Sequence, residues 1–272
     1  MSVHEYRCPM RWGDMDAQGH VNNAVYLDYL QEARVDFLLS GPPVLHTLLD
    51  TGVLVASHQV EYLRPVVFGD RPLTIRLWVD SVGGSRFSLA YEVLDGSELA
   101  ARARTVAVPF DLAGNALRRL TAEERAAFVA AVVETEPLRP VTKLKVGDGG
   151  HRYPLWVRWS DLDSYGHVNN VKYYDYVQEA RIALVAETLG WDDSRPWLVV
   201  RQDLEYRRPI DFRTTPYEVV TVVAEVGNRS VTLAAEIRDA TTTYATARTV
   251  LVAAAPLGPE QRAALERNQA GS

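Results

Sequence analysis

The chain has 272 residues, of which 47% are hydrophobic and 24% are charged, as is typical of globular proteins with one large core or two smaller ones. Its formal net charge of −6 argues against a nucleic-acid partner, because nucleic-acid-binding proteins usually carry a basic face. Cys8 is the sole cysteine, which excludes an intrachain disulfide, and no apolar run approaches the length of a membrane helix or the core of a signal peptide. We therefore expect a soluble cytoplasmic protein with neither a nucleic-acid nor a membrane partner.

The first half of the chain predicts one long helix among several strands. A strand around residues 4–12 leads into a turn that contains Gly19, and apolar residues then recur at helical spacing. These residues are Tyr26, Leu30, Ala33 and Phe37. Segments bounded by Gly, Pro and Asp predict further strands at roughly 53–66, 71–82, 86–95 and 98–110. A Thr121/Glu124 capping box predicts a second helix at the end of this half.

The second half of the chain repeats the first. Residues 158–181 align without gaps to residues 11–34, and 16 of the 24 positions are identical. The same elements follow: a strand at 153–159, a turn containing Gly166, a helix with Tyr173, Val177, Ala180 and Leu184 on one face, and strands near 197–209, 216–226, 230–239 and 243–254. Because residues 134–152 are rich in Pro, Gly and charged residues, we interpret them as a linker between two modules, 1–135 and 150–272. The pattern predicts an α+β layer in each module, an antiparallel sheet wrapped around one helix.

The repeated core has the sequence D-x-D-x-x-G-H-V-N-N-x-x-Y, and an E-Y-x-R-P segment follows it in each copy. This pattern resembles the 4-hydroxybenzoyl-CoA thioesterase superfamily, particularly its bacterial acyl-CoA thioesterases, and also the second half of plant acyl-acyl-carrier-protein thioesterases. The resemblance covers both modules and implies two tandem hotdog modules and hydrolysis of an acyl thioester. Single-module relatives are dimers, so we expect the two sheets to join edge to edge as a pseudo-dimer, which also protects exposed strand edges.

The bacterial acyl-CoA pattern fits better than the plant one. The plant enzymes have an asparagine two residues after the aspartate, where this chain has Gln18 and Tyr165. They also have a Glu-Cys pair after the E-Y-R-R segment, where the second copy has Pro209 and Ile210. We therefore expect an acyl-CoA substrate, with an acyl-carrier-protein thioester as the alternative.

The resemblance makes the second aspartate of each D-x-D, Asp16 and Asp163, the nucleophile or general base. The chemistry agrees, because a thiol leaving group with a pKa of about 8.5 departs without a strong general acid. The reaction still needs a group that delivers oxygen and donors that stabilise the oxyanion. Backbone N–H groups at the start of the following helix are suited to the second task. That start is predicted next to the turn, near these asparagines: Asn22 and Asn23, and Asn169 and Asn170.

The neighbouring residues of the motif have two readings each. His20 and His167 orient the thioester or the aspartate, or hydrogen-bond the turn. Asn22 and Asn169 cap the helix start, or position water or substrate. Gly19 and Gly166 permit a backbone conformation that a β-carbon forbids, or a close approach of the substrate.

Outside the motif, structural roles are the stronger expectation. Arg64 and Arg208 either contact CoA phosphates or are ordinary surface arginines. Asp14 and Asp161 are expected to serve the turn and the cap, and Tyr26 and Tyr173 the core. Glu32 and Glu179 with Arg34 and Arg181 predict a solvated or structural ion-pair surface.

No group of residues has the spacing of a metal site, and we expect no cofactor. Two other classes of function stay open, a non-catalytic acyl-CoA-binding hotdog protein and a hydratase or dehydratase that acts on acyl thioesters. Both aspartates favour hydrolysis, because a pure binding protein has no need of a carboxylate beside the thioester. Further assembly into a homo-oligomer is compatible with the pattern.

Overall fold

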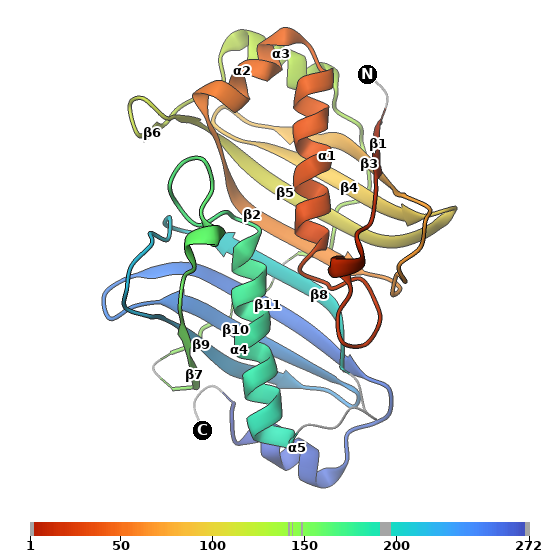
Figure 1. Ribbon diagram of the computed structural model, residues 1–272, viewed down its shortest axis with the longest axis vertical. Coiled ribbons are helices and arrows are strands. Elements are labelled where there is room, and N and C mark those ends of the chain that lie inside the picture. Colours follow the sequence, from red (N-terminus) through yellow and green to blue (C-terminus); the bar gives the residue numbers. More distant parts are fainter. Residues whose placement is uncertain (1–2, 141, 143, 148, 191–196, 270–272) are drawn as a thin grey trace. The chain divides into compact units, whose positions relative to one another are not determined.

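The computed structural model describes residues 3–140, 142, 144–147, 149–190 and 197–269. The chain divides into two compact units, Met1–Arg139 and Pro140–Ser272, which we call module 1 and module 2. In each module one long helix packs against one face of an antiparallel sheet (Figure 1). The predicted α+β layer is therefore present twice.

The strands of module 1 are β1 (His4–Cys8), β2 (Val53–Tyr62), β3 (Leu73–Val82), β4 (Phe87–Asp95), β5 (Glu98–Asp111) and the short β6 (Ala116–Leu117). They pair in the order β1-β3-β4-β5-β2, with β6 on β5. The strands of module 2 are β7 (His151–Leu155), β8 (Trp197–Tyr206), β9 (Tyr217–Val226), β10 (Ser230–Arg238) and β11 (Thr243–Ala253). Their order, β7-β9-β10-β11-β8, is the same, so the sequence repeat is also a repeat of topology.

Every predicted strand is present, but several end earlier than predicted. β1 stops at Cys8 because Pro9 has no N–H for the ladder, and a 3₁₀ turn, η1 (Trp12–Asp14), follows. The corresponding turn of module 2 is η2 (Trp159–Asp161). β2 stops at Tyr62, before the Arg64-Pro65 pair.

The long helices are α1 (Tyr26–Ser40) and α4 (Lys172–Leu189). The residues predicted to face the sheet are all at most 6% exposed: Tyr26, Leu30, Ala33, Phe37, Tyr173, Val177, Ala180 and Leu184. In module 2 Leu184 packs in one cluster with Val223 of β9, Leu233 of β10 and Leu251 of β11. The predicted helix face and the placement of Tyr26 and Tyr173 in the core are confirmed.

The structure corrects one detail of the long helices and decides between two alternatives for another. Neither helix begins at the asparagines; each begins after a turn, and the Oδ1 atom of Asn22 accepts a hydrogen bond from the N–H of Ala24 within that turn. Arg34 and Arg181 are only 6% and 8% exposed, which excludes the solvated one of the two predicted alternatives and leaves the structural one. The buried face of each long helix is therefore wider than its apolar residues alone, because the methylene groups of the arginine side chain can also be buried.

The shorter helices lie at the ends of the modules. The capping box predicted for α3 (Ala122–Ala130) is confirmed, with Glu124 N–H donating to Thr121 Oγ1 at 3.1 Å and Thr121 N–H donating to Glu124 Oε2 at 2.8 Å. α5 (Pro259–Glu266) occupies the corresponding tail of module 2. Among the described residues of module 2, α2 (Pro43–Thr51) has no counterpart. It was not predicted, although proline at its start and Gly52 after its end are typical helix signals.

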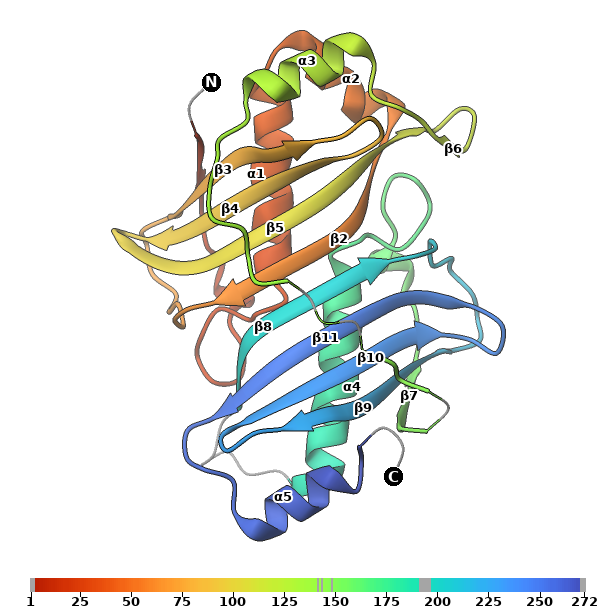
Figure 2. The same cartoon turned by 180° about the vertical axis from the view of Figure 1, so that it is seen from behind.

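The opposite face of the module 1 sheet is crossed by the chain that leaves α3 (Figure 2). Val133 N–H donates to the carbonyl of Val79 at 3.0 Å, and Trp78 Nε1 donates to Thr135 Oγ1 at 3.1 Å. Within the described part of the chain, no helix has the length and apolar character needed to span a membrane.

Candidate active site

Asp16 lies in a tight loop between η1 and α1, and the loop holds it through one carboxylate oxygen. Asp16 N–H donates to the carbonyl of His20 at 2.8 Å, and Gly19 N–H donates back to the carbonyl of Asp16 at 3.0 Å. The Oδ1 atom accepts the N–H groups of Gln18 and His20 at 2.9 and 3.2 Å. Among the described residues no donor is bonded to Oδ2. The half-buried carboxylate is thus oriented and keeps one oxygen for a further partner.

Module 2 builds the same loop around Asp163. Asp163 N–H donates to the carbonyl of His167 at 2.8 Å, and Gly166 N–H donates to the carbonyl of Asp163 at 3.1 Å. Here Oδ1 accepts the N–H of Tyr165 at 2.8 Å. The distances common to the two loops agree within 0.1 Å.

The loop glycines are required by backbone conformation. Gly19 and Gly166 have φ of 78° and 80°, in the left-handed region that other residues adopt only at a cost. A β-carbon on either residue would meet no protein atom within 4 Å, so crowding by the protein does not explain them. Of the two predicted reasons, the conformational one is confirmed.

The first aspartate of each D-x-D braces the loop instead of facing outward. Asp14 Oδ2 accepts the N–H of Arg11 at 2.7 Å and the hydroxyl of Tyr29 at 2.6 Å. The carbonyl of Asp14 accepts the N–H of Asn22 at 2.8 Å. Burial and the bond to the carboxylate raise the pKa of Tyr29, so its hydroxyl stays a donor. This turn-and-cap role is the one predicted.

Module 2 repeats the brace with a more buried carboxylate. Asp161 is 8% exposed, and its Oδ2 accepts Arg158 N–H at 2.8 Å and the Tyr176 hydroxyl at 2.7 Å. Burial and the bond to Asp161 raise the pKa of Tyr176. Tyr29 and Tyr176 were missed in the sequence, although each is identical in the two copies and lies on a helix face that is otherwise apolar.

The asparagines lie in the turn that precedes each helix. Asn22 Oδ1 accepts the N–H of Ala24 at 2.9 Å, and Asn169 Oδ1 accepts the N–H of Val171 at 3.3 Å, so both brace the turn that precedes the helix and do not cap the helix itself. The carbonyls of the next asparagines are also used. Tyr62 and Tyr206, from β2 and β8, donate their hydroxyls at 2.7 Å to the carbonyls of Asn23 and Asn170 respectively. These two tyrosines belong to the E-Y-x-R-P segments, which explains why that segment accompanies the loop.

The two histidines have different surroundings. Nε2 of His167 lies 3.6 Å from Oδ1 of Asp211, and both side chains are partly exposed. The position equivalent to Asp211 in module 1 is Val67, which is 61% exposed. His20 makes no side-chain hydrogen bond or ion pair with another described residue. The loops match, but the groups beside their imidazoles do not.

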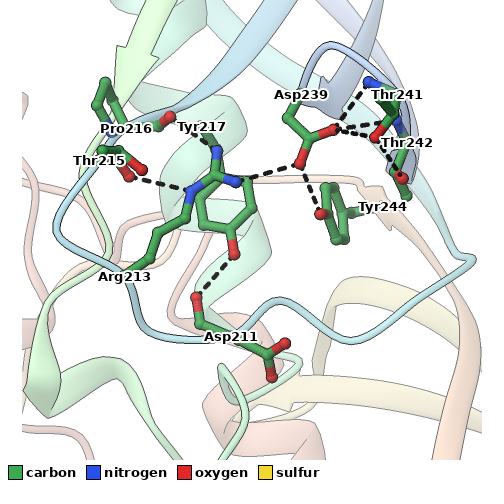
Figure 3. A network of polar contacts seen from close by, with 9 residues as sticks. All are labelled: Asp211, Arg213, Thr215, Pro216, Tyr217, Asp239, Thr241, Thr242 and Tyr244. Carbon is green, nitrogen blue, oxygen red and sulfur yellow. Dashed lines mark hydrogen bonds and ion pairs between the residues drawn. The ribbon is translucent and has the colours of Figure 1, made fainter.

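A network of polar and aromatic side chains holds the chain around Asp211 (Figure 3). The guanidinium of Arg213 stacks 3.4 Å above the ring of Tyr217 and donates to Asp239 Oδ2 at 3.1 Å. The hydroxyl of Tyr217 donates to the carbonyl of Asp211 at 2.9 Å. The network holds the backbone of the segment between β8 and β9 at Asp211, whose side chain is exposed near His167.

The predicted CoA-contacting arginines differ in their partners. Arg64 Nη2 pairs with Asp95 Oδ2 at 3.0 Å, in its own module, and Asp95 also pairs with Arg71 at 3.0 Å. Arg208 is exposed, and its guanidinium pairs with no other described residue. The charge of Arg64 is therefore largely compensated, whereas that of Arg208 faces solvent.

No cluster of His, Cys, Asp and Glu in the described ranges has the arrangement of a metal site. A cavity of about 510 Å³ in module 1 is not at the candidate loop. It lies on the sheet face away from α1, where it is lined by Trp78, Asp80, Arg104 and Thr135 among others. Asp80 and Arg104 already form an ion pair at 2.6 Å, so the polar lining is internally satisfied.

Residues 10–143 and 157–255 match the family model of the thioesterase-like superfamily, and these ranges include both candidate loops. The chain belongs to this superfamily. The predicted family resemblance is thereby confirmed. This thioesterase-like chain is also 29% identical over 186 residues, 65% of its length, to the acyl-[acyl-carrier-protein] hydrolase FATB3, chloroplastic, of Cuphea viscosissima. The chain spans 43% of the length of that relative.

Solved structures with a similar fold include two thioesterases. The 12:0-ACP thioesterase from Umbellularia californica is 20% identical, with a TM-score of 0.74 over 92% of this chain and 97% of that chain. The putative oleoyl thioesterase from Lactobacillus plantarum is 16% identical, with a TM-score of 0.73 over 92% and 95%. At these identities the likeness establishes the fold alone, which is the hotdog thioesterase fold that was predicted.

Proposed function

We propose that the protein is an acyl-CoA thioesterase in which Asp16 and Asp163 are the reacting carboxylates. The supporting observation is the same in both modules: the loop that precedes the long helix orients the aspartate through Oδ1, and no described residue donates to Oδ2. A carboxylate oriented in this way is suited to attack a carbonyl or to take a proton from water.

The reaction consumes water and releases a carboxylic acid and CoA. In one route the free carboxylate oxygen attacks the thioester carbon, the C–S bond breaks, and water then hydrolyses the resulting anhydride. In the other route the carboxylate deprotonates a water molecule, which attacks the same carbon, and the proton ends on the leaving thiolate. Both routes develop negative charge on the carbonyl oxygen, and we assign its stabilisation to the N-terminal ends of α1 and α4, where the helix dipole is positive.

A thioester of acyl-carrier protein is the second candidate substrate. It is supported by the similarity to the FATB3 hydrolase and to the 12:0-ACP thioesterase described above. The acyl-CoA reading rests on Gln18 and Tyr165, which replace the asparagine of the plant pattern. Rates on matched acyl-CoA and acyl-carrier-protein substrates decide between the two.

The catalytic test is the substitution Asp→Asn. Asparagine keeps the Oδ1 acceptor and so preserves the loop, but it is a poor nucleophile and base. We expect Asp16→Asn with Asp163→Asn to lower thiol release by about 10²-fold or more. Asp50→Asn, an exposed aspartate on α2, is the matched control and keeps its rate. A folded double variant with near-normal turnover would exclude the assignment, and CoA binding by a wild-type protein without turnover would favour the binding-protein alternative.

We further propose that both sites work and that the modules join as a pseudo-dimer. Asp, Gly, His and both Asn are present in each loop. To test whether both sites work, Asp16→Asn and Asp163→Asn are assayed separately on several acyl-CoAs. If one variant abolishes all hydrolysis and the other changes nothing, only a single site acts. X-ray scattering tests the pseudo-dimer, because independently tumbling modules are incompatible with it. Sedimentation then tests for a homo-oligomer.

A further inference from the structure

Each module exposes a tryptophan at the same place in the repeat. Trp12 and Trp159 are both 73% exposed, although burial of an indole is strongly favourable. Each lies in the 3₁₀ turn just before the D-x-D aspartates. A single exposed tryptophan needs no explanation, but two at equivalent positions suggest that the exposed ring has a use.

The two indoles are held in the same way. Trp12 meets Phe68 edge to face, with ring centroids 5.6 Å apart and an interplanar angle of 82°. Trp159 meets Phe212 with centroids 5.4 Å apart and an angle of 84°. The carbonyl two residues before each phenylalanine accepts a hydrogen bond from the candidate loop, at 2.8 Å in module 1 and 2.9 Å in module 2. The aromatic pair is therefore attached to the loop and preorganised, yet most of the indole surface stays open.

A cation precedes each indole. Arg11 and Arg158 are exposed, and neither guanidinium makes a hydrogen bond or ion pair with another described residue. This differs from Arg64, whose charge is paired with Asp95. In a chain of net charge −6, an uncompensated guanidinium next to an open aromatic ring is a local attraction for an anionic aromatic ligand.

We infer that each Arg-Trp pair binds the adenine nucleotide of CoA, with the adenine ring on the indole and a phosphate on the guanidinium. The inference rests on the proposed function and deepens it, because acyl-carrier protein shares the phosphopantetheine arm but has no adenine. Trp12 and Asp16 are four residues apart, so their Cα atoms are separated by at most about 14 Å, and the flexible pantetheine arm has to fold back to connect the two positions. The nucleotide then binds at the edge of the site while the thioester reaches the carboxylate.

The first experiment measures binding without turnover. Calorimetry on the intact chain carrying Asp16→Asn and Asp163→Asn gives Kd for CoA, for its isolated nucleotide part and for pantetheine. Adding Trp12→Ala and Trp159→Ala should raise Kd for CoA and the nucleotide by about 5- to 50-fold and leave pantetheine unchanged. Trp12→Phe with Trp159→Phe keeps an aromatic face and should restore most of the affinity. Trp156→Ala, which removes another exposed tryptophan, is the control and should change nothing.

The second experiment separates this inference from the proposed function. On the otherwise wild-type chain, the two Trp→Ala substitutions should raise KM for acyl-CoA by a similar factor relative to KM for the same acyl-pantetheine. The inference is overturned if KM rises equally for both substrates, or if Trp156→Ala has the same effect as the two substitutions. It is also overturned if the substitutions change only the oligomeric state. The proposed hydrolysis stands in each of these cases. Tryptophan-dependent CoA binding in a protein that hydrolyses no thioester would support the nucleotide site and remove the proposed function.

Discussion

Removing the hydroxyl of Tyr176 tests whether the first aspartate of the motif is structural. Tyr176 is 6% exposed and donates at 2.7 Å to Asp161, which is itself 8% exposed. In Tyr176→Phe the ring remains, so no sizeable cavity forms. The carboxylate loses one of its two donors to Oδ2 and keeps the N–H of Arg158. The perturbation is therefore the loss of one charged hydrogen bond in a site that water enters poorly.

The expected cost follows from that geometry. A hydrogen bond to a charged group contributes about 1.5–3 kcal/mol, and burial of the acceptor favours the upper part of this range. We expect Tyr176→Phe to lower the free energy of unfolding by about 2–3 kcal/mol. Tyr29→Phe in module 1 should cost less, about 1–2 kcal/mol, because Asp14 is only half-buried and water replaces part of the lost bond.

Urea unfolding followed by far-UV circular dichroism measures both variants against the wild type. The transition midpoint should fall with an unchanged m-value, since the exposed area on unfolding is the same. Tyr153→Phe is the control, because the Tyr153 hydroxyl bonds to no other residue in the described ranges. Equal midpoints for Tyr176→Phe and Tyr153→Phe, or a larger loss in Tyr29→Phe than in Tyr176→Phe, would refute the reasoning.

Three further predictions concern module 1. Burial opposes ionisation of Glu124, but the bidentate ion pair with Arg118 outweighs it and holds the pKa of Glu124 below 4.5. The stability that this ion pair gives is present above that value and is lost as pH falls. Glu124→Gln should therefore flatten the dependence of stability on pH, measured by urea unfolding between about pH 3 and 6. Phe128→Ala should cost about 3–5 kcal/mol, because Phe128 is fully buried and stacks 4.1 Å from Phe87; a midpoint equal to that of the wild type contradicts this packing role. Burial and nearby carboxylates raise the pKa of Cys8 to about 12, so Ellman's reagent at pH 8 should label it only in denaturant, and rapid labelling of the native protein would be inconsistent with its burial.

The sequence predicted the fold well because its signals were periodic and occurred twice. The helix faces and strand segments follow from the spacing of apolar residues, and the repeat showed that the pattern was not accidental. Element ends were less predictable. β1 ends at Cys8 because Pro9 follows, and a search for alternating residues overlooks this local signal. α2 is short and has no counterpart among the described residues of module 2 that would have drawn attention to it.

The candidate site was predictable in its residues but not in their division of work. The sequence pattern places Asp14 and Asp16 two residues apart, and neither composition nor spacing says which oxygen meets which donor. The distinction depends on Tyr29, which lies 15 residues away and reaches the first carboxylate across a turn of the chain. Such pairings depend on tertiary structure. Burial of Arg34 was unpredictable for the same reason, since it depends on the surface that surrounds the helix and not on the charge of the residue.

The two modules of a fused chain can differ from each other, whereas the two subunits of a homodimer cannot. In a symmetric dimer every substitution occurs in both sites, so a change that suits one substrate is imposed on both. In a fused chain the loops around Asp16 and Asp163 share most of their hydrogen bonds, although the bond from His20 N–H to Asp16 Oδ1 is found only in module 1 among the described residues. Their surroundings can change independently. Val67 gives one loop an exposed apolar neighbour, where Asp211 gives the other a charged one, held by Tyr217 through its carbonyl. Similar loops with different neighbouring residues agree with the proposal that the two sites are tuned for different acyl groups. The separate assays of Asp16→Asn and Asp163→Asn on several acyl-CoAs test whether both loops act and whether they prefer different acyl groups.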